Sequence, residues 1–193
     1  MRPPGPILEP GDLVLTRGKG WISKAIRFFT RGIGEPRTKV NHVGVITVGG
    51  ALTTAVIVEA IAKVERNRLW MRYGPPDGDQ VAIYRHRYLN EDGRREIVRK
   101  MESYVGRRYD WLSIVGHTLD YALLGVFLFR RFLRMKRYGQ CVWCVTSSYH
   151  LGAGVTFGGP PAEMSPDHVW DSVNGHPVTW ERVWPLGPLS LPG

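Results

Sequence analysis

The stretch VNHVGVITVGGALTTAVIVEAI, residues 40–61, decides the fold of this 193-residue chain. Two runs rich in Val and Ile flank a glycine pair that signals a turn, so we predict two antiparallel strands, 40–48 and 55–61. Glu59 interrupts the second run, and a carboxylate is costly to bury there unless it has a partner. The simpler alternative is an edge strand that leaves Glu59 in water.

The pairing of these two strands places a histidine beside that carboxylate. If the strands pair about the step from Gly50 to Ala51, His42 lies directly opposite Glu59. Side chains directly opposite each other share a face, with Cβ atoms about 4.5–5.5 Å apart, whereas a shift of one residue separates them. A carboxylate in that place would accept a hydrogen bond from the imidazole and raise its basicity. The alternative for His42 is a strand histidine satisfied by its surroundings.

The rest of the chain is read by the same patterns. Short apolar runs predict strands, and apolar residues at helical spacing predict helices. We expect strands at 13–15 and 80–85, and helices at 21–30, 92–105, 110–135 and 141–151. The last forty residues, rich in Pro and Trp, are expected to hold little regular structure. This order of elements predicts an α+β fold, with an antiparallel sheet packed against helices.

Composition bounds the class of protein. Hydrophobic residues make up 43% and charged residues 22% of the chain, which is ordinary for a globular protein and excludes a disordered, collagen-like or coiled-coil chain. The longest apolar run, 121–129, is far shorter than the roughly 18–20 residues of a membrane span. We expect an extended arm over 1–10, one domain over 11–170, and a Pro- and Trp-rich tail over 171–193 packed on that domain.

Charge gives the first indication of partners. The formal net charge is +9, which favours an anionic surface such as an acidic wall polymer or anionic lipid. A merely basic soluble surface is the plain alternative, because the charge forms no compact block apart from the fold. Binding to nucleic acid would rest on this charge alone, and we expect no specific nucleic acid. The N-terminus carries no apolar segment of the signal-peptide kind, so we expect synthesis in the cytoplasm.

Cys141 is the candidate nucleophile of the sequence. It follows a turn ending at Gln140 and begins the predicted helix 141–151, where the helix dipole lowers the pKa of a thiol. A neutral histidine nearby would turn it into a thiolate nucleophile. Cys144 lies one turn further on and is expected in the core. A buried structural thiol is the alternative for Cys141 as well.

Three other chemistries use the same residues. Cys141 and Cys144 form a C-x-x-C pair, although the βαβ pattern of thioredoxin-like proteins is missing. Half a zinc site would need two more ligands, with His150, His168 and His176 available, but no second pair has the spacing of a zinc finger. A serine hydrolase would need a G-x-S-x-G turn, which is absent. We therefore expect neither a cofactor nor a metal.

Short motifs in a shared order carry a resemblance to a known family. They are GDLVL (11–15), WISKAI (21–26), NHVGV (41–45), VEA (58–60), GRRYDW (106–111), CVWCV (141–145) and MSPD (164–167). Over residues 11–170 the chain resembles the circularly permuted branch of the NlpC/P60 superfamily, papain-like thiol hydrolases grouped with the YiiX/YebB-like proteins. Two positions depart from the family pattern: Val142 replaces a small polar residue, and Cys144 stands where the family has Leu.

The resemblance implies a mechanism and a substrate. Cys141 would attack a carbonyl carbon, His42 would move the proton, and Glu59 would orient the imidazolium. The implied reaction is cleavage of an amide bond in peptidoglycan peptides. The lack of a leader fits a phage-encoded protein, carried on the virion among its tail proteins or released to the cell wall, or else a cytoplasmic enzyme. Residues expected to support the site or bind substrate are Asn41, Tyr109, Trp21 and Gln140.

Two further readings of function stay open. The same fold could be a catalytically idle structural or binding module, such as a tail component. It could also be a hydrolase of lipid acyl groups at a membrane surface, with the apolar segment 114–132 lying on lipid. A core helix is the alternative for that segment.

Overall fold

The computed structural model of the chain describes residues 5–18, 39–61, 63–75, 80–108 and 141–189. The helices expected at 21–30 and 110–135 lie outside these residues, as does the apolar segment 114–132. Within the described part of the chain, no helix has both the length and the apolar character needed to cross a membrane.

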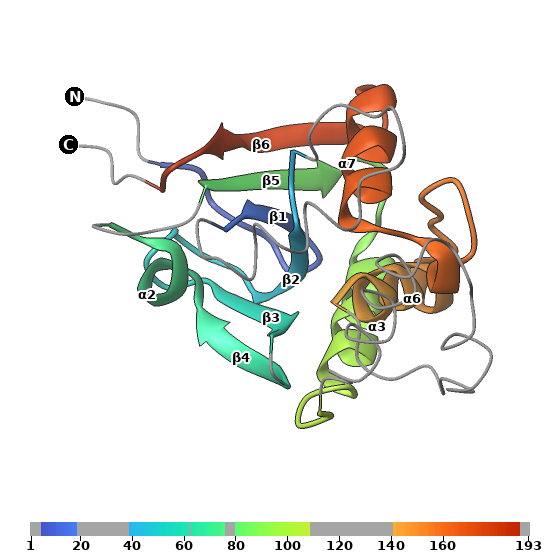
Figure 1. Cartoon of the computed structure of the whole chain (residues 1–193), viewed down its shortest axis with the longest axis horizontal. Coiled ribbons are helices and arrows are strands. Elements are labelled where there is room, and N and C mark those ends of the chain that lie inside the picture. The colour runs from blue at the N-terminus through green and yellow to red at the C-terminus, as the bar shows by residue number, and fades with distance from the viewer. Residues whose placement is uncertain (1–4, 19–38, 62, 76–79, 109–140, 190–193) are drawn as a thin grey trace, which may run out of the picture.

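Six antiparallel strands form one sheet with the order β4-β3-β2-β1-β5-β6 (Figure 1). The strands are β1 (Leu13–Arg17), β2 (His42–Val48), β3 (Val56–Ala60), β4 (Val64–Arg68), β5 (Gln80–His86) and β6 (Trp180–Gly187). The strands expected around 13–15, 40–48, 55–61 and 80–85 are therefore present as β1, β2, β3 and β5.

Alternating strand residues divide the core into two layers. One face of the sheet, which includes Leu15, Val43 and Val58, packs against the three long helices. These helices are α3 (Glu91–Glu102), α6 (Cys141–Ala153) and α7 (Pro166–Gly175). The other face packs against the short helix α2 (Leu69–Tyr73), and a 3₁₀ turn, η1 (Pro161–Glu163), precedes α7. An antiparallel sheet packed against helices confirms the α+β prediction.

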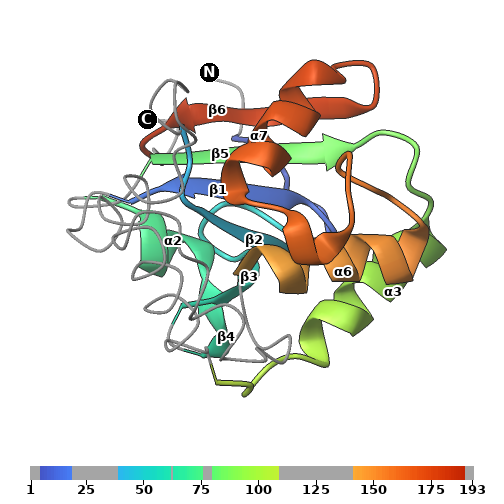
Figure 2. The ribbon, with the colours of Figure 1, turned by 45° about the vertical axis from the view of Figure 1, so that its right-hand side comes forward.

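Close packing of α3 and α6 fixes the helix that carries Cys141. The two helices lie side by side (Figure 2). A Cβ atom on Gly152 would lie 2.8 Å from the backbone nitrogen of Ile97, so only glycine allows the helices to approach this closely. Tyr149 lies in the C-terminal half of α6, and its buried hydroxyl donates a hydrogen bond of 2.6 Å to the carbonyl oxygen of Gly11. These contacts tie α6 to α3 and to the segment that leads into β1.

The expectation of little regular structure at the end of the chain is wrong. Ser165 caps α7, because its hydroxyl accepts a hydrogen bond from the backbone N–H of His168, and Pro166 follows at the first helical position. Trp180 is buried at the start of β6 and stacks on Phe157 at 5.4 Å between ring centroids. Local capping and this aromatic anchor produce a helix and a strand where composition indicated loops.

The predicted register of the central hairpin is also wrong, by two residues. Glu59 pairs with Gly44 rather than with His42. The reason is the connection: residues 49–55 join the strands in place of a two-residue turn, and the ladder is irregular between Ile46 and Val48. Because side chains alternate with a period of two, this even shift leaves His42 and Glu59 on the same face.

Candidate active site

His42 and Glu59 are joined by a hydrogen bond despite the shifted register. His42 begins β2 and Glu59 lies near the end of β3. They are diagonal neighbours, and the imidazole Nε2 lies 2.8 Å from Oε2 of the carboxylate. The Glu59 side chain has no exposed surface, so its charge depends entirely on protein partners. The pairing leaves Nδ1 as the ring nitrogen free to meet a third group.

That third group is the thiol of Cys141. The residue begins α6 as expected from the sequence and is 7% exposed. Its thiol interacts with the His42 imidazole and with the backbone of Val43 and Val142. The structure therefore brings Cys141, His42 and Glu59 into one line of contacts at the N-terminus of α6.

Electrostatics in this line favour a charged thiol and a charged imidazole. Burial alone would lower the pKa of His42, but the neighbouring Cys141 and Glu59 raise it to about 10. Burial alone would raise the pKa of Cys141, but the imidazolium, together with the backbone at Val43 and Val142, lowers it. These shifts favour a thiolate next to an imidazolium, with Glu59 ionised behind it.

Three more side chains surround Glu59. Tyr73 donates its hydroxyl to Oε2, and Asn67 donates from Nδ2 to Oε1 at 3.1 Å. The Nε atom of Arg72 lies 3.7 Å from Oε1. Sequence reasoning missed all three, since β4 and α2 were not predicted. The only signal was Asn67, an uncharged polar residue within the otherwise mostly charged stretch VERNR, 64–68.

Of the four supporting residues expected from the sequence, the structure describes Asn41. Its Oδ1 accepts a hydrogen bond of 2.9 Å from the backbone N–H of Gly18, and its own N–H donates to the carbonyl of Thr16 at 2.9 Å. Asn41 thus fixes the backbone directly before His42 against the end of β1. Trp21, Tyr109 and Gln140 lie outside the described residues.

Cys144 lies in the core, as expected. It has no exposed surface, and burial raises the pKa of its thiol to about 12. Both cysteines are free thiols. Within the described residues, no group of three or more His, Cys, Asp or Glu side chains is arranged to hold a metal ion.

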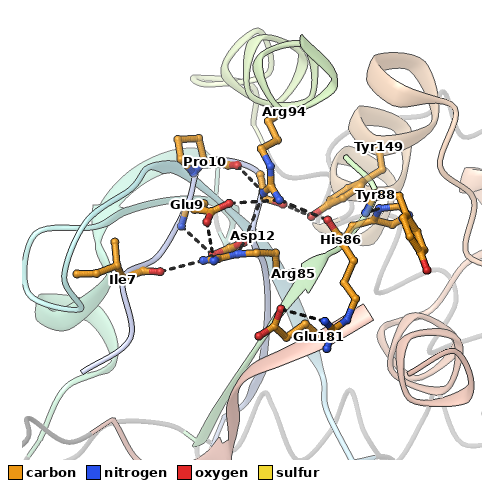
Figure 3. Close-up of polar contacts among 12 residues, drawn as sticks. Ile7, Glu9, Pro10, Asp12, Arg85, His86, Tyr88, Arg94, Tyr149 and Glu181 are labelled. Carbon is orange, nitrogen blue, oxygen red and sulfur yellow. Dashed lines mark hydrogen bonds and ion pairs between the residues drawn. The ribbon is translucent and has the colours of Figure 1, made fainter. Parts of the chain in front are cut away.

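A second buried carboxylate, Asp12, belongs to a separate charged network (Figure 3). Arg85 donates to it from Nε at 2.9 Å and from Nη2 at 2.7 Å, and Arg94 lies 3.7 Å away. Glu9 pairs with Arg85 at 2.6 Å. This network joins residues 7–12 to β5 and α3.

Comparison with known proteins supports the fold. No family model matches the chain, and no curated protein matches it. Among solved structures, the chain is similar to the crystal structure of the metalloprotein YiiX from Escherichia coli O157:H7, DUF1105, with a TM-score of 0.50 and 16% sequence identity. The match covers 97% of this chain and 88% of that chain. Identity this low shows the fold alone, and the name YiiX agrees with the family that the sequence resembles.

Proposed function

We propose that this chain is a thiol hydrolase that cleaves an acyl bond, with Cys141 as nucleophile, His42 as acid and base, and Glu59 as the carboxylate behind it. The observation that carries the proposal is the line of contacts from the thiol at the start of α6 through the imidazole to Glu59. A thiol whose pKa is lowered by a histidine, with the histidine oriented by a third group, is the arrangement of an activated nucleophile.

The proposed reaction has two halves. The Cys141 thiolate attacks the carbonyl carbon, and the imidazolium of His42 gives its proton to the leaving amine as the C–N bond breaks. Water then attacks the resulting thioester while His42 takes a proton from the water, and the C–S bond breaks to release the acid product and restore the Cys141 thiolate beside the His42 imidazolium. The backbone N–H of Cys141 at the helix start is a suitable donor to the oxyanion of each tetrahedral intermediate.

For the substrate we propose an amide bond in peptidoglycan peptides. The resemblance to wall-cleaving thiol hydrolases supports this choice, and the net charge of +9 suits an acidic wall polymer. An ester or thioester of a lipid acyl group would use the same chemistry at the carbonyl carbon.

The test is to incubate the full chain with purified peptidoglycan, and separately with phospholipid vesicles, and to identify products by mass spectrometry. We expect new peptide termini from the wall that disappear in Cys141→Ala and His42→Ala. Cys144→Ala is the matched control, because it removes the other thiol of the same helix without touching His42. Fatty-acid release from vesicles would replace the wall substrate by a lipid one. No product from either, together with an ordinary thiol pKa for Cys141, would refute the hydrolase.

A further inference from the structure

The carboxylate of Glu59 has more donors than are needed to orient one histidine. Its Oε2 accepts from His42 at 2.8 Å and also from the Tyr73 hydroxyl. Its Oε1 accepts from Asn67 at 3.1 Å, with the Arg72 guanidinium 3.7 Å away. A carboxylate fully removed from water needs such donors to stay charged.

The three added side chains come from two adjacent elements beside the site. Asn67 lies on the edge strand β4, and Arg72 and Tyr73 end the short helix α2. Tyr73 is 1% exposed, and a buried hydroxyl is costly unless it has a partner. Arg72 is 42% exposed, and its guanidinium lies 5.4 Å from the centre of the Tyr73 ring. The structure thus places a buried hydroxyl, an amide and a cation around one carboxylate.

The other charged groups near Glu59 set the balance of charge. Glu65 is the register partner of Glu59 in the ladder between β3 and β4, and its side chain accepts a hydrogen bond from Asn67 at 3.5 Å. Lys63 lies 4.0 Å from Glu65. On the opposite side stand His42 and, beyond it, Cys141. With the thiolate, imidazolium and carboxylate all charged, the reacting line carries one net negative charge.

We propose that Tyr73, Asn67 and Arg72 are positioning residues that hold Glu59 ionised and aimed at His42, and so sustain the Cys141 thiolate. The inference rests on the proposed function, and it adds a layer of the site contributed by β4 and α2. Its physical consequence has a definite sign. Donors and a cation stabilise the state with one net negative charge, so their removal makes the thiol proton, whose loss forms that state, harder to lose and raises the apparent pKa of Cys141.

The test measures the pH profile of Cys141 alkylation by iodoacetamide between pH 4 and 9. The full chain has two cysteines, so a Cys144→Ala background leaves Cys141 as the single thiol. In that background we expect Tyr73→Phe to move the midpoint up by about one pH unit, the size of one charge-assisted hydrogen bond, or about tenfold slower labelling below the midpoint. Asn67→Ala, on the half-buried edge strand, should move it in the same direction. Arg72→Gln should also raise it, and Arg72→Lys should restore it in part.

Tyr84→Phe is the matched control. Tyr84 is 1% exposed, as is Tyr73, and its hydroxyl donates at 2.9 Å to Asn174 on α7. We expect this variant to lose stability while keeping the parental pH profile. If Tyr73 had a purely structural role, Tyr73→Phe would behave in the same way as this control.

The outcomes separate this inference from the proposed function. A midpoint that is unchanged or lowered in Tyr73→Phe and Asn67→Ala, while His42→Ala raises it, overturns the positioning role and leaves the hydrolase standing. An ordinary thiol midpoint in the parent overturns both.

Discussion

Replacing Arg85 by methionine should destabilise the fold by leaving a buried charge without its main partner. Asp12 has no exposed surface, and Arg85 is 18% exposed. The guanidinium holds both carboxylate oxygens, through Nε at 2.9 Å and Nη2 at 2.7 Å, as Figure 3 shows. Methionine keeps the length of the apolar stem and removes the charge and the donors.

The expected loss follows from what remains around Asp12. Removing one partner of a buried ion pair costs about 3–5 kcal/mol. Here Glu9 still donates its backbone N–H to Asp12 at 2.8 Å, and Arg94 stays 3.7 Å away. These two contacts place the loss at the lower end, about 3 kcal/mol.

Urea unfolding of the parent and Arg85→Met, followed by circular dichroism, measures that loss. The matched control is Arg99→Met. Arg99 also contacts both oxygens of a carboxylate, that of Glu96, but its side chain is 65% exposed, so its replacement should cost far less stability than that of Arg85. A loss below about 1 kcal/mol for Arg85→Met, or one equal to the control, would show that the ion pair of Arg85 and Asp12 contributes no more than an exposed ion pair, and would refute the reasoning. Adding Asp12→Leu to Arg85→Met should recover part of the loss, because both charges are then gone.

Three further predictions concern Glu59, Gly152 and Cys144. The partners of Glu59, His42 foremost, lower its pKa from the ordinary 4.5 although burial opposes them, so its charge stabilises the fold above pH 4.5 and that stabilisation is lost as the pH falls through the lower folded value. The gap in free energy of unfolding between the parent and Glu59→Gln should therefore narrow as the solution is acidified below pH 4.5. Gly152→Ala should cost about 2 kcal/mol in a thermal or urea melt, because the new Cβ meets the backbone of α3; Gly175→Ala, where nothing lies within 4 Å, should cost almost nothing. Native alkylation at pH 7 should label Cys141 and spare Cys144, since burial raises the pKa of Cys144 to about 12; equal labelling of both would contradict the structure.

The sequence predicts the elements whose patterns are strong within a single segment. Runs of Val and Ile at 40–48 and 55–61 form β2 and β3, and the helical spacing between 92 and 105 forms α3. Other elements depend on distant partners. β4 carries three charged residues in five, and its pairing with β3 supplies what its composition lacks. β6 exists because Trp180 is buried against Phe157 and Tyr149, a contact that no local pattern shows.

The candidate site was accessible from the sequence for a geometric reason. The register was misplaced by two residues, yet the face of each side chain depends only on whether a shift is even or odd. His42 and Glu59 therefore meet as diagonal neighbours. The layer around Glu59 was not accessible, because α2 is five residues long and has no periodicity to detect, and Tyr73 reaches Glu59 only after β3 and β4 have paired.

Two buried carboxylates of the fold differ in the partners that hold their charge, and the difference separates the structural role of Asp12 from the chemical role proposed for Glu59. Asp12 is neutralised by Arg85, whose guanidinium does not release a proton, so the pair fixes the segment before β1 onto β5 but transfers nothing. Glu59 faces an imidazole, which does gain and lose protons, and its other hydrogen-bond donors are the uncharged Tyr73 and Asn67, while the Arg72 guanidinium stays 3.7 Å away. A guanidinium hydrogen-bonded to both oxygens, as Arg85 is to Asp12, would compensate the charge of Glu59 and weaken its hold on the imidazolium. Neutral donors stabilise the carboxylate and leave its charge to act on His42, which is what a thiolate at the start of α6 requires.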